Sequence, residues 1–146
     1  MLTLNANGLY CELGNFYIDP IRPVETAIIT HGHADHARWG METYIATPPT
    51  CDIMKIRLGP DIQTIAHPFD QPFEHNGVRI TLIPAGHILG SAQVKIETHS
   101  QTAIVTGDFK TEADPTVEVF RPTPCDLFVM ETTFGLPIYH WPSPAS

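Results

Sequence analysis

A cluster of metal-ligand side chains follows a short apolar run near the start of this chain. The apolar residues Ala27-Ile28-Ile29 lead directly into Thr30-His31-Gly32-His33-Ala34-Asp35-His36. Such a run predicts a buried strand, which would deliver imidazole and carboxylate groups to one turn at its end. Imidazole nitrogen suits zinc, and a carboxylate suits zinc or manganese. Single histidines in loops are mostly solvated, but four ligand-type residues within six positions indicate a metal site.

The spacing within the cluster favours two ions. In an extended segment, side chains two residues apart point the same way, so His31 and His33 can bind one ion. Asp35 and His36 lie further along and can face a second ion beside the first. Two metals held about 3.5–4 Å apart are a known device for hydrolysing phosphate esters and related bonds. The cluster therefore favours a two-metal hydrolase.

Two later segments place further ligand-type residues at the ends of predicted strands. The run 78–83 is followed by Gly86-His87, and the run 103–105 is followed by Gly107-Asp108. A histidine between glycines suits a backbone that bends sharply near a bulky group. A lone Gly-Asp pair is more often a simple turn. The ordered series of three strand ends nevertheless favours one shared site.

At this point the chain resembles the metallo-β-lactamase superfamily. The segment Met130-Glu131-Thr132-Thr133-Phe134-Gly135 resembles the Glu-Ser/Thr-Thr-Tyr/Phe-Gly element of its β-CASP nucleases. Among these, the chain resembles most the bacterial ligase-associated DNA exonucleases, which are related to messenger-RNA 3′-end processing nucleases. Segments 14–20, 86–94 and 134–139 also fit this group, and the resemblance extends from about residue 4 to residue 142.

The resemblance implies roles for side chains around two divalent ions, zinc or manganese. The implied ligands are His31, His33 and His87 for the first ion, Asp35 and His36 for the second, and Asp108 between both. Asp19 would orient a ligand histidine, as such ligands usually require, and Glu131 would lie beside the site. Two plainer readings stay open, namely an Asp-Pro turn at Asp19 and a solvated strand-end carboxylate at Glu131.

The implied activity is exonucleolytic hydrolysis of DNA phosphodiesters, in DNA repair or end processing. Asp35 and Asp108 would act catalytically by holding and orienting the attacking water. Ser91 would donate to a phosphate, and Lys110 would offset charge on the phosphoryl oxygens. Lys110 equally fits a solvated surface charge. The implied partners are DNA, an ATP-dependent DNA ligase and a helicase.

The implied fold is the four-layer αβ/βα metallo-β-lactamase sandwich, here its β-rich amino-terminal αβ half. Residues 1–135 would form this half, and the Pro-rich segment 136–146 would be a linker toward a cap domain. Family members add a further histidine for the second metal, and His140 lacks the context for that role. We therefore expect a fragment with an incomplete second site that is inactive alone. We also expect it to associate, because a sheet face that includes Ile28, Ile104, Phe128 and Val129 would be uncovered.

Local signals place the individual elements. Hairpins are expected at 9–19, 73–82 and 92–106, and Asn76-Gly77 is a strong two-residue turn signal for the second. The remaining expected elements are strands at 26–30, 43–47 and 126–131, a short helix at 34–39 and a longer helix at 49–58.

Composition agrees with an intracellular domain but not with strong DNA binding. The net charge is −8 with histidine neutral, and two divalent ions would bring it to −8 + 4 = −4. DNA usually meets a basic surface, so a cap would have to supply much of the contact. The cysteines, Cys11, Cys51 and Cys125, form no Cys-x-x-Cys pair. They predict free thiols in a reducing cytoplasm, and no signal peptide or membrane span is evident.

Two alternatives remain open from the sequence. A thioester or lactone hydrolase of the same superfamily would share the cluster from His31 to His36. An inactive metal-binding fragment would also account for it. The segment from Glu131 to Gly135, which suits a nuclease with a cap, favours the nuclease over the small-molecule hydrolase.

Overall fold

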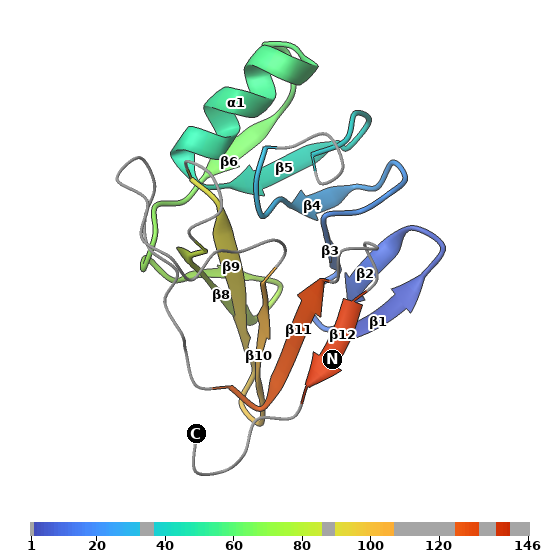
Figure 1. Cartoon of the computed structure of the whole chain (residues 1–146), viewed down its shortest axis with the longest axis vertical. Helices are drawn as coiled ribbons and strands as arrows, with labels where there is room; N and C mark the ends of the chain where they lie inside the picture. Colours follow the sequence, from blue (N-terminus) through green and yellow to red (C-terminus); the bar gives the residue numbers. More distant parts are fainter. Residues whose placement is uncertain (1, 33–36, 86–89, 107–124, 132–136, 141–146) are drawn as a thin grey trace.

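The computed structural model describes residues 2–32, 37–85, 90–106, 125–131 and 137–140, with backbone alone for 127–131 and 137–140. Within these residues the chain forms two six-stranded sheets and one helix (Figure 1). The helix has 11 residues. In the part of the chain covered by this description, no helix is long and apolar enough to cross a bilayer.

Sheet A contains the first six strands in sequence order. Its strands are β1 (Leu2–Asn5), β2 (Gly8–Cys11), β3 (Phe16–Ile18), β4 (Thr26–Ile28), β5 (Thr43–Ala46) and β6 (Thr64–Ala66). The first three strands are antiparallel, whereas β3, β4, β5 and β6 are mutually parallel. The helix α1 (Pro48–Leu58) connects β5 to β6. It begins with two prolines and ends before Gly59, because proline fits the first turn of a helix and glycine fits the position just after its end.

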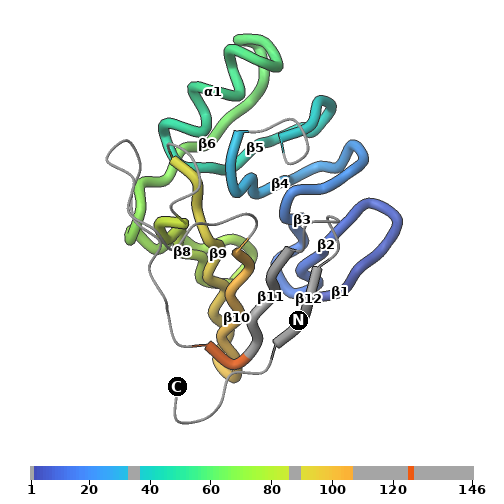
Figure 2. Tube along the Cα trace, viewed as in Figure 1, coloured from blue at the N-terminus to red at the C-terminus, as the bar shows by residue number. Residues whose placement is uncertain are grey.

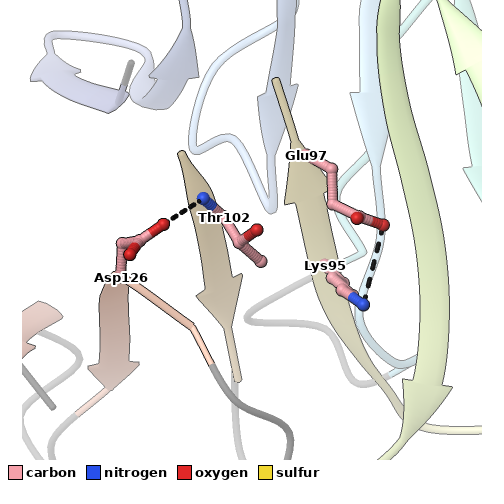
Figure 3. A network of polar contacts seen from close by, with 4 residues as sticks. All are labelled: Lys95, Glu97, Thr102 and Asp126. Carbon is pink, nitrogen blue, oxygen red and sulfur yellow. Dashed lines mark hydrogen bonds and ion pairs between the residues drawn. The ribbon is translucent and has the colours of Figure 1, made fainter. Parts of the chain in front are cut away.

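Sheet B contains the remaining strands in the order β12-β11-β10-β9-β8-β7. Its strands are β7 (Phe73–His75), β8 (Val78–Pro84), β9 (Ala92–Glu97), β10 (Thr102–Val105), β11 (Leu127–Glu131) and β12 (Pro137–His140). Only the pair β10–β11 is parallel. Asp126, just before β11, joins this strand to β10, because its carboxylate accepts from Thr102 N at 2.7 Å (Figure 3). On β9, Lys95 and Glu97 form an ion pair (Figure 3).

The main core lies between the two sheets. Its largest members include Phe16 and Ile28 from sheet A and Ile80, Leu82 and Ile96 from sheet B, all fully buried. A smaller cluster lies between sheet A and α1, around Tyr44, Met54 and Ile29. The layers are therefore helix, sheet and sheet, and Figure 2 shows α1 at one end of sheet A beside β5 and β6.

The expectation of an uncovered sheet face was wrong for Ile28 and Ile104, whereas Phe128 and Val129 are described by their backbone alone. Ile28 and Ile104 are each 0% exposed. Ile28 is covered because sheet B packs directly on sheet A, so one face of each sheet is already buried within this chain. The basis for expecting association through these residues is therefore removed.

The three predicted hairpins and the helix at 49–58 are confirmed. Strands β1, β6 and β12 were not predicted, and β12 lies inside the segment 136–146 that was expected to be a linker. Its four residues extend sheet B by pairing with β11. Of the short helix expected at 34–39, residues 37–39 are not helical and residues 34–36 lie outside the description.

Candidate metal centre

The parallel strands of sheet A direct three successive loops to one edge. Asp19 follows β3, Thr30 and His31 follow β4, and Thr47 follows β5. Because these strands are mutually parallel, their carboxyl ends lie at the same edge. In open sheets with parallel strands, ligands bind outside the carboxyl ends of the strands. This edge of sheet A is therefore where a site is expected.

Sheet B directs its candidate segments to a single edge as well. Strands β8 and β10 are both antiparallel to β9, and β11 is parallel to β10. The carboxyl ends of β8, β10 and β11 therefore lie beside the amino end of β9. In the sequence, His87 follows β8, Asp108 follows β10, and Glu131 ends β11. Ala92 N at the start of β9 donates to Thr30 O at 2.7 Å, which joins this edge to the edge of sheet A.

A hydrogen-bond network fixes the surroundings of His31. The Asp19 carboxylate accepts from Thr30 N at 2.8 Å and from the Thr30 hydroxyl at 2.6 Å. The same hydroxyl oxygen lies 3.2 Å from His31 Nδ1. The hydroxyl has one proton, which goes to the carboxylate, so its oxygen can only accept from the imidazole. His31 is thus held with the proton on Nδ1.

This network suits a metal ligand. A ligating histidine usually donates its other ring N–H to a neighbouring acceptor, which fixes both tautomer and ring orientation. With the proton on Nδ1, the lone pair of His31 is on Nε2, which is a buried atom. Neutral imidazole nitrogen is a normal zinc donor. His31 therefore fits the role of a zinc ligand, with Asp19 acting on it through Thr30.

Asp19 reaches this position through an uncommon backbone conformation. Its φ is 46°, in the left-handed region that Asp tolerates better than most residues. Its backbone N–H donates to Ile28 O at 3.0 Å, which ties the end of β3 to the end of β4. The turn at Asp19 therefore places the carboxylate that accepts the hydrogen bonds from Thr30. Thr30 was not recognised from sequence, although its position directly before the first histidine of the cluster was a signal.

The other predicted ligands cannot be placed. His33, Asp35, His36, His87 and Asp108 lie outside the described residues, as does Lys110. Of Glu131 the backbone alone is described, at the end of β11 opposite Pro137. Considering only the residues that are described, no group of three or more metal-ligand side chains is found. The full ligand set stays a prediction.

Hydrogen bonds join the residues on the two sides of the segment 86–89, which carries His87. Ala85 N donates to Ser91 O at 3.0 Å, and the Gln93 side chain donates to Pro84 O at 3.0 Å. Ser91 is 2% exposed, so its hydroxyl does not face bulk solvent. A contact between Ser91 and a substrate phosphate stays a prediction.

The cysteines are free thiols, as the sequence predicted. Burial raises the pKa of Cys11 and of Cys51 above 9.0, and burial also raises that of Cys125. Cys11 lies in the core between the two sheets, and Cys51 lies in the cluster between sheet A and α1. The candidate donors that the sequence pattern offers are imidazoles and carboxylates.

Several known proteins are similar to this chain in sequence. No family model matches the chain. A probable DNA ligase of Opitutus terrae is 34% identical over 144 residues, which is 96% of this chain and 14% of the ligase. Endoribonuclease YSH1 of Candida glabrata is 37% identical over 62 residues, 41% of this chain and 8% of that protein. The chain thus spans a small part of these relatives.

Solved structures share the layer arrangement. A metallo-β-lactamase from Cronobacter sakazakii superposes with a TM-score of 0.56 at 16% identity. The match covers 73% of this chain and 57% of the other. The expected metallo-β-lactamase fold is confirmed, and two β-sheets with a helix beside one of them correspond to the amino-terminal half of its four layers.

Proposed function

We propose that this chain, which belongs to the metallo-β-lactamase superfamily and is related to its nucleases, forms part of a metal-dependent hydrolase that cleaves phosphodiester bonds. The observation that carries the proposal is the network from Asp19 through Thr30 to His31. It lies where the strand ends of both sheets meet. A histidine that ligates a metal usually has its ring fixed in this way by a hydrogen bond from its other nitrogen, which supports the proposal.

The mechanism assigns distinct tasks to the chain's own residues. Two divalent ions, when bound, supply an acidified water and offset negative charge on a phosphoryl group. His31, His33 and His87 would hold the first ion, and Asp35, His36 and Asp108 the second, with Asp108 shared. Asp35 and Asp108 would also orient the attacking water. Ser91 and Lys110 would donate to phosphate oxygens, and Glu131 would support the site from the end of β11.

The proposed substrate is DNA, digested from an end in repair or end processing. The similarity over nearly the whole chain to a probable DNA ligase supports an association with an ATP-dependent ligase. The similarity to an endoribonuclease supports phosphodiester chemistry and makes RNA the competing substrate. The free thiols support the proposal of a cytoplasmic protein, where thiols stay reduced.

The experiment compares three substrates in zinc or manganese buffer, namely an end-labelled DNA duplex, an end-labelled RNA and a nitrophenyl ester. The 146 residues offer the second ion only Asp35, His36 and a share of Asp108. We therefore expect the chain alone to digest DNA negligibly. Fusion to the remaining part of a full-length homologue should give metal-dependent release of nucleotides that Asp35→Ala abolishes.

The outcomes separate the alternatives. Digestion of RNA but not DNA would overturn the substrate while keeping the chemistry. Hydrolysis of the ester alone would favour a small-molecule hydrolase. Nuclease activity insensitive to Asp35→Ala would overturn the mechanism.

A further inference from the structure

The backbone on both sides of the segment 33–36 is bound by one side chain of α1. The guanidinium of Arg57 donates through the same Nη1 to Gly32 O and to Ala37 O, the latter at 3.4 Å. Gly32 directly precedes His33, and Ala37 directly follows His36. A single side chain therefore spans the two ends of the segment that carries three of the predicted ligands.

The same helix contacts Gly32 by packing. A Cβ on Gly32 would lie 2.5 Å from Ile53 Cγ2, which is closer than atoms can approach without a shift. Ile53 lies one helical turn before Arg57 on α1. Gly32 is thus packed closely against α1, and a larger residue at this position would force Ile53 to shift.

The amino-terminal end of α1 binds Gly90, the residue that follows the second candidate segment. The hydroxyls of Thr47 and Thr50 both donate to Gly90 O, at 2.6 and 3.1 Å. Gly90 has a φ of +80°, and a Cβ there would lie 2.9 Å from both hydroxyl oxygens and from Pro49. Gly90 closes the segment 86–89, which carries His87. This end of α1 therefore fixes the backbone beside the third predicted ligand of the first ion.

We propose that α1 is a shared brace for the two ligand segments, and that Arg57 is the positioning residue for the first of them. The proposal rests on the proposed function only in that these segments carry metal ligands. The helix is suited to the task because its buried residues Cys51 and Met54 pack against sheet A. The brace is therefore anchored to the same sheet that presents His31.

Arginine is the appropriate residue for this contact. Its planar guanidinium is always charged and presents several donors in a fixed geometry, so it can serve two carbonyl oxygens at once. Lysine has a flexible ammonium and would not hold both carbonyls in one arrangement. The contact of Arg57 with Gly32 O and Ala37 O is partly buried. Its loss should loosen the two ends of the segment 33–36 and leave the hydrophobic core intact.

The test measures zinc affinity and backbone protection in the 146-residue chain. Zinc affinity is measured by competition with a fluorescent chelator, and amide hydrogen exchange is followed in peptides covering 30–38 and 85–92. We expect Arg57→Met to weaken zinc binding about 10-fold, as outer contacts to ligands typically do, and to speed exchange in 30–38. Lys55→Met is the matched control, because it removes a charge from the exposed side of the same helix.

A second pair of variants keeps the test decisive if Arg57→Met unfolds. Arg57→Lys keeps the positive charge and a long aliphatic side chain, and it should reproduce the faster exchange in 30–38 at an unchanged Tm. Thr50→Val should speed exchange in 85–92 and leave 30–38 unchanged. Faster exchange in the expected peptide for either variant supports the brace.

Wild-type exchange and wild-type zinc affinity in folded Arg57→Met or Arg57→Lys would overturn the proposal. If the wild-type chain binds no zinc, the metal centre of the proposed function fails. The exchange of 30–38 would still report whether Arg57 holds the backbone, so the two failures are distinguishable.

Discussion

At the level of single residues, the Thr30 hydroxyl links the Asp19 carboxylate to His31. His31 could be recognised because it stands in a cluster of ligand-type residues after an apolar run. Thr30 could not, because its role depends on the parallel pairing of β3 with β4, which brings Asp19 beside it. From the sequence, Asp19 was expected either to orient a ligand histidine or to form a plain Asp-Pro turn, and His31 itself stays a predicted ligand. The structure adds that a hydroxyl lies between the two.

The first prediction concerns this hydroxyl. Thr30→Val keeps the shape of the side chain but removes the acceptor for His31 Nδ1–H and one donor to Asp19. We expect zinc affinity to fall between roughly 10- and 100-fold, the usual cost of losing such a partner. Chelator competition measures the change, and Thr3→Val on the exposed strand β1 is the control. Equal zinc affinity in both variants would exclude the orienting role of Thr30.

A second residue-scale prediction concerns pH. His67 stacks on Phe73 with ring centroids 3.7 Å apart, and burial lowers its pKa below the ordinary 6.5. The unfolded chain therefore takes up a proton more readily than the folded chain as the pH falls. Stability contributed by neutral His67 is present above pH 6.5 and is lost as the pH falls below it.

The measurement is the Tm at pH 7 and pH 5 for wild type and two variants. His67→Phe, which keeps an aromatic ring on Phe73, should reduce the loss of Tm between the two pH values. His99→Gln, in the exposed turn between β9 and β10, should leave that loss unchanged. A loss of Tm equal in wild type and His67→Phe would show that other groups govern the pH dependence.

At the level of elements, turn chemistry was the most informative local signal. Asn76 and Gly77 adopt φ values of 50° and 82°, as the Asn-Gly pair predicts for a hairpin turn. The sequence could not show that the Asn76 side chain also donates to Gly14 O at 2.6 Å, which ties a turn of sheet B to a turn of sheet A. The strands that escaped prediction, β1, β6 and β12, are short edge strands defined by pairing partners.

Gly77, in the hairpin turn between β7 and β8, allows the effect of backbone conformation to be separated from that of the side chain. Gly77→Ala places a Cβ on a left-handed residue and should lower the free energy of unfolding by about 1 kcal/mol. Gly77→Asn should cost less, because Asn tolerates that region better. Urea denaturation measures both. A Cβ at Gly77 meets no atom within 4 Å, so a cost equal for Ala and Asn would point away from backbone conformation as the cause.

At the level of the whole molecule, the packing of one sheet on the other is the feature that sequence reasoning missed. The apolar strands were recognised, but nothing local specifies which face of β4 meets which face of β8. The structure buries Ile28 between the sheets together with Ile80 and Leu82. Cohesion of the two sheets therefore comes mainly from this core, and at the site edge from the bond between Ala92 N and Thr30 O.

Zinc should strengthen that junction, because its predicted ligands follow strands of both sheets. His31 and His33 follow β4 of sheet A, whereas His87 and Asp108 follow β8 and β10 of sheet B. An ion held by ligands from both sheets would cross-link them in the folded state only. Free zinc at about 100 times its Kd should then raise the free energy of unfolding by about 2.7 kcal/mol.

The measurement is the Tm of the chain in EDTA and in a zinc buffer, together with zinc content per chain. Wild type should bind about one zinc per chain tightly and should gain Tm in zinc, because binding free energy adds to folding free energy. His33→Ala should lose most of both effects because one donor is removed from the first ion, whereas His99→Ala, in an exposed turn, should keep them. If His33→Ala binds zinc and gains Tm as wild type does, the histidine cluster is not the site, and the two sheets are held together without it.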